Sequence, residues 1–195
     1  MNLVETTVKD PQDIPEDLSV DEKPTWLEGD KVYIATTVGQ GCILGVEIVR
    51  NATGDALEKA YGVFQQEARS LNPDYAPETV NTDGWQATQN AWKRLFPFAC
   101  LLLCFLHLYI KIRDRSKKKY KHTGKQTCDK LWDCYQAKDK RTFSQRIRRL
   151  HQWAKDNLVP DFMLNTIENC VQTKLFLLVL TIIHKLIAQA ICWIG

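Results

Sequence analysis

Hydrophobic and polar positions change their period several times along the chain. Leu18–Glu22 is a short β-prone run, and richer runs follow at Lys31–Val38 and Cys42–Val49. The last two runs are separated by the glycine-rich segment 39–41, which is typical of a β-hairpin turn. The sequence therefore predicts that the chain opens with three strands.

A helical period replaces this pattern from Asp55 onward. Apolar positions recur at helical spacing until Asn72-Pro73, where the helix is expected to end. A short strand is then expected over residues 78–83, with Asp83 at its carboxyl end. The first half of the chain therefore predicts three strands, a helix and a fourth strand.

The next segments extend this alternation and then become helical. Trp85–Phe96 has helical spacing, and Ala99–Phe105 is almost wholly apolar, as in a strand that is buried on both faces. Residues 127–157 and 161–171 are expected to be helical. This order predicts an α/β fold with a mixed sheet and flanking helices.

Composition places the chain among globular proteins, and its charges are unevenly distributed. Of its 195 residues, 45% are hydrophobic and 25% are charged, which excludes wholesale disorder and collagen-like architecture. Residues 1–90 hold 16 acids and 6 bases, a net charge of −10, whereas residues 91–195 hold 7 acids and 20 bases, a net charge of +13. This division predicts an acidic pocket and a second surface that binds polyanions. Seven cysteines without a recognisable secretory signal predict reduced thiols and a cytoplasmic protein.

Two aspartates lie where the expected sheet would expose them. Asp21 is on the first strand, and Asp83 is at the end of the fourth. If these strands are neighbours, the two carboxylates can share divalent metal, which would suit in-line attack on a phosphodiester. The alternative is that Asp83 is a turn aspartate before Gly84 and that Asp21 is an exposed strand-end charge.

Several ordered segments resemble one protein family. Val80–Pro97, Leu103–His107 and Ile110–Arg115 resemble prokaryotic insertion-sequence transposases of the DDE type, and more distantly Mutator-type transposases. In the latter, a strand-end aspartate is followed by a helix, a Phe-Pro pair, a strand and a C-x-x-H pair. Leu18–Glu22 and Gly29–Gly45 are similar to the part of the family that bears its first catalytic acid.

The resemblance implies a ribonuclease-H-like fold: a mixed sheet with flanking helices and a C-terminal helical insertion, here incomplete. It implies that Asp21 and Asp83 are the first two catalytic acids and bind Mg²⁺ (or Mn²⁺) for DNA strand cleavage and transfer. The third acid has no match, because Glu168 is the only acid beyond Asp161 and its context differs from that of the family. We therefore expect the chain to be inactive by itself.

Three further residues are candidates near this site. Glu22 could assist the metal or be an exposed partner of Lys23. Cys104 and His107 form a C-x2-H pair, and the resemblance implies that His107 lies near the active site. A zinc site would need more ligands, for which the available cysteines are Cys100, Cys128 and Cys134. Structural packing of Cys104 and His107 is the favoured alternative.

Basic residues form two runs in the second half of the chain. Such runs bind DNA phosphates with release of counterions, although a single run is more often a solvated helix face. The candidate DNA-binding residues are Lys111, Arg113, Arg115, Lys117, Lys118, Lys119, Lys121, Arg146, Arg148 and Arg149. The expected partners are transposon ends and target DNA, together with a second copy of the chain or a full-length transposase.

The expected organisation has four parts. A flexible lead-in spans residues 1–17, a partial catalytic core 18–115, a basic helical insertion 116–173 and an apolar tail 174–195. Synonymous codons for Val179–Gly195 can be chosen so that a shifted frame reads as a continuation of the family, which suggests a frameshift before Lys174. Two other functions stay open: a catalytically dead DNA-binding inhibitor, and a membrane-anchored protein spanning with Leu175–Ile194, although membrane contact is the less favoured.

Overall fold

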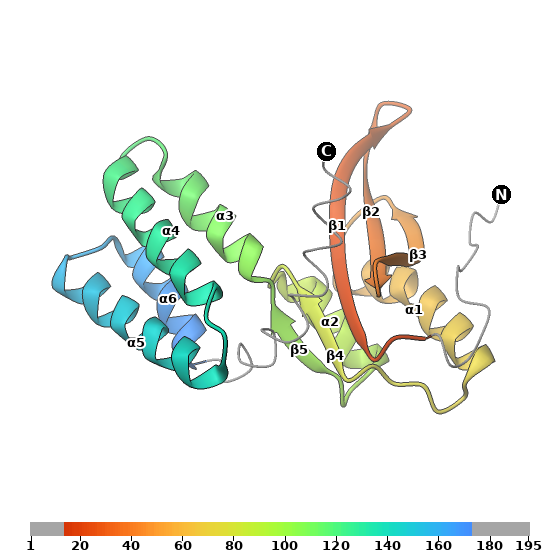
Figure 1. Ribbon diagram of the computed structural model, residues 1–195. Helices are drawn as coiled ribbons and strands as arrows, with labels where there is room; N and C mark the ends of the chain where they lie inside the picture. Colours follow the sequence, from red (N-terminus) through yellow and green to blue (C-terminus); the bar gives the residue numbers. More distant parts are fainter. Residues whose placement is uncertain (1–13, 173–195) are drawn as a thin grey trace. The chain divides into compact units, whose positions relative to one another are not determined.

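The computed structural model describes residues 14–172, which belong to two compact units (Figure 1). The first, which we call the sheet unit, ends at Leu102, and the second, the helical unit, begins at Leu103. The sheet unit contains β1 (Asp17–Leu27), β2 (Asp30–Gly39), β3 (Cys42–Val49), α1 (Gly54–Leu71), β4 (Thr79–Thr82), α2 (Gln86–Leu95) and most of β5 (Cys100–Leu103). This order of strands and helices is the one predicted from the sequence.

The five strands form one mixed sheet in the order β3-β2-β1-β4-β5. β2 pairs antiparallel with both β1 and β3, whereas β1 pairs parallel with β4. A parallel neighbour requires a crossover connection, and here β3 and α1 lie between β1 and β4 in the chain. The sheet is mixed and helices flank it, so the predicted α/β fold class is confirmed.

One face of the sheet packs against α1 and α2. Because side chains alternate along a strand, Leu18, Val20 and Glu22 all point to this face, and all three are buried. Trp92 of α2 is fully buried at the centre of this core, stacked on Phe96 at a ring-centroid distance of 5.5 Å. The opposite face therefore carries Asp21.

The first strand is longer than the sequence predicts. It was expected to end at Glu22 but continues to Leu27, and its last residues pair only with β2. Glu28 (φ 52°) and Gly29 (φ 89°) make the turn, a left-handed pair that suits a two-residue hairpin. Figure 1 shows the β1–β2 hairpin extending as an arm beyond the other strands.

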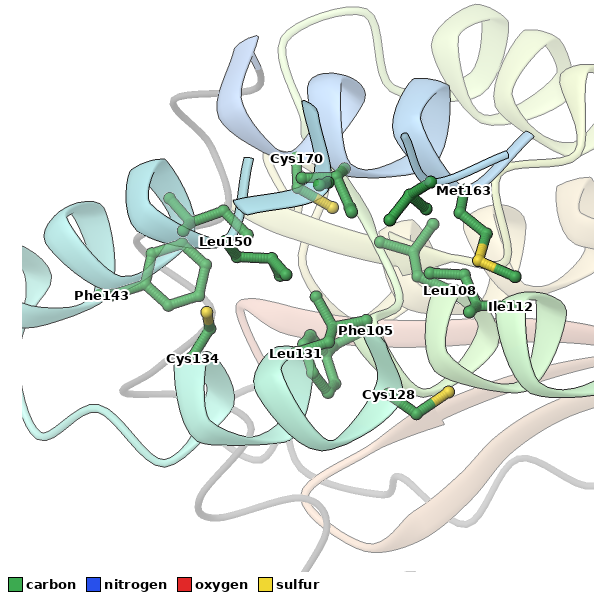
Figure 2. Close-up of a cluster of buried hydrophobic side chains, with 14 of the residues drawn as sticks. Phe105, Leu108, Ile112, Cys128, Leu131, Cys134, Phe143, Leu150, Met163 and Cys170 are labelled. Atoms are coloured by element: carbon green, nitrogen blue, oxygen red, sulfur yellow. The ribbon is translucent and has the colours of Figure 1, made fainter. Parts of the chain in front are cut away.

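Four helices make up the helical unit: α3 (Phe105–Ser116), α4 (Lys121–Tyr135), α5 (Lys140–Asp156) and α6 (Asp161–Gln172). Their apolar faces meet in one core that includes buried cysteines from α4 and α6 (Figure 2). α3 and α4 approach closely, since a Cβ at Gly124 would lie 2.0 Å from Ser116 Oγ. Glycine is therefore required at this crossing.

Two local predictions in this unit were wrong. Phe105 begins α3 instead of ending a strand, with Cys104 as the N-cap residue. The helical stretch expected over residues 127–157 is two helices, because Asp139 caps a new one by accepting a hydrogen bond from the Thr142 amide at 2.8 Å.

The candidate membrane span, Leu175–Ile194, lies outside the described residues, as does the tail assigned to a frameshift. Within residues 14–172, no helix has the length and apolar character needed to cross a bilayer.

Candidate metal centre

The two candidate acids follow the paired part of two adjacent parallel strands, β1 and β4. The last pair in their register is Ser19 with Asn81. Asp21 comes two residues after Ser19 within β1, and Asp83 comes two residues after Asn81, directly after the end of β4. This is the neighbour relation on which the predicted metal site depended. Both acids lie at the carboxyl end of this pairing, which is where open α/β sheets place their sites.

The negative charges of Asp21 and Asp83 both affect the pKa of one neighbouring acid, Glu22. Burial is the largest cause of the raised pKa of Glu22, and the negative charges of Asp83 and Asp21 raise this pKa further. The same two charges also raise the pKa of Tyr61, after burial and the effect of Glu22. The three acids therefore form one electrostatically connected group.

Asp83 also has the role of a turn residue. Its Oδ1 accepts a hydrogen bond from the Trp85 amide at 2.6 Å, and Gly84 adopts a left-handed φ of 89°. The alternative that Asp83 is a turn aspartate is thus correct for its Oδ1 oxygen. A carboxylate has two oxygens and about four lone-pair positions, so this turn leaves Asp83 able to bind a cation.

Glu22 is buried instead of being an exposed partner of Lys23. Alternation along β1 places it on the core face, opposite Asp21, where it is only 9% exposed. Its Oε1 accepts hydrogen bonds from the Tyr61 hydroxyl and, at 2.8 Å, from the Thr88 hydroxyl. The Tyr61 hydroxyl also lies 3.5 Å from the Asp21 carbonyl oxygen. Glu22 therefore ties β1 to α1 and α2 directly behind the candidate site.

Tyr61→Phe is expected to destabilise the chain by about 1–3 kcal/mol, because Glu22 then keeps only the Thr88 hydroxyl as a side-chain donor. Chemical unfolding would measure this change. Tyr33→Phe is the matched control. The Tyr33 hydroxyl makes no hydrogen bond with the described side chains, so this substitution should change the free energy of unfolding little. Equal effects of the two substitutions would contradict the proposed role of the Glu22 contacts.

A third acid does not join the pair. Among residues 14–172, no three His, Cys, Asp or Glu residues are placed to hold one metal ion. Glu168 lies in α6 of the helical unit, with its Oε1 3.1 Å from His151 Nε2 and 3.8 Å from Lys155 Nζ. It therefore has a structural role in the helical unit.

Asn81 is a polar residue that the sequence reasoning missed. By strand alternation it shares the face of Asp83, and its Oδ1 is shielded from solvent without a hydrogen-bond donor among the described residues. Two carboxylates and an amide oxygen are hard donors, and Mg²⁺ often binds one or two carboxylates while keeping several waters. The residues present therefore fit Mg²⁺.

The C-x2-H pair is a local hydrogen-bonded unit, and within residues 14–172 no further ligands join it in a group that could hold a metal ion. Cys104 and His107 lie at the start of α3, and the pKa of the Cys104 thiol is lowered by the His107 side chain and nearby amides, although burial opposes this. Cys128 and Cys134 are buried in the helical core, where burial raises their pKa values to about 11 and about 12. They pack as apolar side chains, which supports the structural alternative.

The candidate DNA-binding residues all lie in the helical unit. The first run is exposed along α3, the α3–α4 turn and the first residue of α4. It is partly neutralised, because Asp114 pairs with Arg113 at 3.0 Å and with Lys117 at 2.8 Å. Arg146, Arg148 and Arg149 lie on α5. Arg146 donates a hydrogen bond to the main-chain carbonyl of Asp133, so its guanidinium is held in place.

Comparison with known proteins found similarity at the level of structure. No family model and no curated protein matches the chain. Among solved structures, it is similar to the catalytic core domain of the HTLV-2 integrase, solved in complex with magnesium in a trimeric form. The identity is 15%, the match covers 63% of this chain and 87% of that chain, and the TM-score is 0.32. The fold assignment therefore rests on the strand order of the chain itself.

Proposed function

We propose that the sheet unit carries the divalent-metal acid pair of a DDE-type transposase and that the helical unit binds DNA. The observation that supports this proposal best is the parallel pairing of β1 with β4, because Asp21 and Asp83 each come two residues after the last pair, Ser19 with Asn81. The resemblance of the surrounding segments to insertion-sequence transposases supplies the reaction class, which is DNA strand cleavage and transfer.

Each residue of the site has a distinct proposed role. Asp21 and Asp83 would hold Mg²⁺ or Mn²⁺, which when bound supplies Lewis-acid activation of a phosphodiester and its attacking hydroxyl. Asp83 is oriented by its hydrogen bond from the Trp85 amide. Glu22 orients β1 from behind through Tyr61 and Thr88.

We further propose that this chain does not cleave DNA by itself. The family uses three acids, and within residues 14–172 no group of three His, Cys, Asp or Glu residues is placed to hold a metal ion. A DNA-binding protein that restrains a full-length transposase through mixed oligomers is thus the second candidate function. The exposed basic residues of the helical unit favour it.

A plasmid assay tests these two statements together. Supercoiled DNA incubated with the chain and Mn²⁺ is expected to be retarded on a gel but not nicked. Nicking that disappears in Asp83→Asn would overturn the proposed inactivity and support the acid pair. Absence of DNA retardation at low salt would contradict both candidate functions.

A further inference from the structure

A polar groove between α4 and α5 carries cations from both helices. It has a volume of about 400 Å³ and is lined by Lys130, Asp133, Gln136, Arg146, Arg149 and Leu150. On α5, Arg146, Arg149 and Leu150 follow i, i+3, i+4 spacing and thus share one face. On α4, Lys130 and Asp133 are related in the same way. The groove is therefore a product of helix packing, and Lys130 belongs to neither basic run of the sequence.

The charge of this groove is positive. Three cations face one carboxylate, that of Asp133. Across residues 14–172, neither Lys130 nor either arginine of the groove takes part in an ion pair. Burial has the largest effect on the pKa of the Cys134 thiol and raises it; the charges of Arg146 and Lys130 oppose this rise, and that of Asp133 adds to it. The charges of Arg146 and Lys130 thus reach the same thiol.

Two of the three cations are held before any ligand binds. Arg146 donates to the Asp133 carbonyl, and Lys130 Nζ lies 4.9 Å from the centroid of the Trp153 ring. Ordered cations lose less side-chain entropy on binding, which favours affinity. Guanidinium groups match phosphate oxygens in bidentate geometry.

We propose that the α4–α5 groove binds a backbone phosphate of DNA through Lys130, Arg146 and Arg149. The phosphate chemistry follows from the groove, whereas its origin in DNA rests on the proposed function. A long polyanion is favoured over a small phosphorylated molecule because the same unit carries further exposed cations, among them Lys118 and Lys121, which only an extended ligand would use.

Arg148 and Arg149 provide a matched pair of variants. Both are exposed arginines on α5, but only Arg149 lines the groove, since adjacent helical residues point about 100° apart. With the full chain, a labelled 20-base-pair duplex and EDTA, Arg149→Gln is expected to weaken binding about five- to tenfold and to reduce the slope of log K against log salt by about one. Arg148→Gln removes an exposed charge outside the groove and is expected to weaken binding by a smaller factor, about two- to threefold.

Two outcomes would overturn the proposal. Equal losses for the two variants, with unchanged melting temperatures, would overturn the groove, because diffuse charge alone would then explain binding. The second outcome is a dissociation constant for inorganic phosphate below about 1 mM together with a duplex affinity that Arg149→Gln leaves unchanged. In that case the ligand of the groove is a small phosphate, and the assignment to DNA is wrong. Because the measurement is made in EDTA, it does not depend on metal binding by the acid pair, so failure of the acid pair leaves this test intact.

Discussion

Asp83→Asn is expected to weaken the binding of Mn²⁺ by at least tenfold, about 1.4 kcal/mol. The substitution removes one of the two carboxylates of the proposed metal site, which follow the paired ends of β1 and β4, and divalent cations in oxygen sites depend strongly on ligand charge. Titration followed by the electron paramagnetic resonance of free Mn²⁺ would measure the change.

Asparagine is the informative replacement at this position. Its amide oxygen can still accept the hydrogen bond from the Trp85 amide, so the turn is retained. Asp30→Asn, which neutralises an exposed acid on the β1–β2 arm, is the matched control and should leave Mn²⁺ affinity within about twofold. If Asp30→Asn and Asp83→Asn weaken binding equally, general charge and not the acid pair attracts the ion.

The helical unit is expected to lose stability steeply above about pH 9. Burial raises the pKa values of Cys128, Cys134 and Cys170 from 9.0 to about 11, about 12 and about 12. Between pH 9 and these values the folded chain keeps protons that the unfolded chain has lost, so rising pH favours unfolding. Each thiol contributes at most about 1.4 kcal/mol per pH unit, a stabilisation fully present below pH 9.

Chemical unfolding at pH 8.5, 9.5 and 10.5 in reducing buffer would measure this slope. In the double variant Cys134→Ala/Cys170→Ala, the slope of the unfolding free energy against pH should fall by up to about 3 kcal/mol per pH unit. Lysines and tyrosines titrate in both proteins, so their contributions cancel in the comparison. Cys42→Ala removes an exposed thiol and should leave the slope unchanged. An unchanged slope in the double variant would contradict this prediction, because it would show that the two thiols ionise as readily in the folded chain as in the unfolded chain.

The order of elements was accessible from sequence because each element has a local signal. The hairpin turn at residues 39–41 and the helical spacing after Asp55 require no long-range information. The fold class followed from this order. The sequence could not show that β1 and β4 are adjacent, so the metal site was predicted on the condition that they are. Pairing of strands that are about 60 residues apart in the chain depends on tertiary packing.

Two errors in the site have identifiable causes. Glu22 was interpreted either as an acid that assists the metal or as an exposed partner of Lys23, yet Leu18 and Val20 already set the alternation that buries it. The arm beyond Glu22 was missed because Pro24 and charged neighbours weaken the strand signal, whereas pairing with β2 alone suffices to extend it. Lys130 could not be connected with Arg149, because only helix packing brings them to one groove.

The alternation of Asp21 and Glu22 has a consequence for folding accuracy. If β1 slipped by one residue against its neighbours, every side chain of the strand would change face. Leu18 and Val20 would enter water, Asp21 would enter the core, and Glu22 would lose both hydroxyl donors. Misaligned chains would thus forfeit apolar burial and polar contacts at once, so the correct alignment of β1 is selected by several independent penalties.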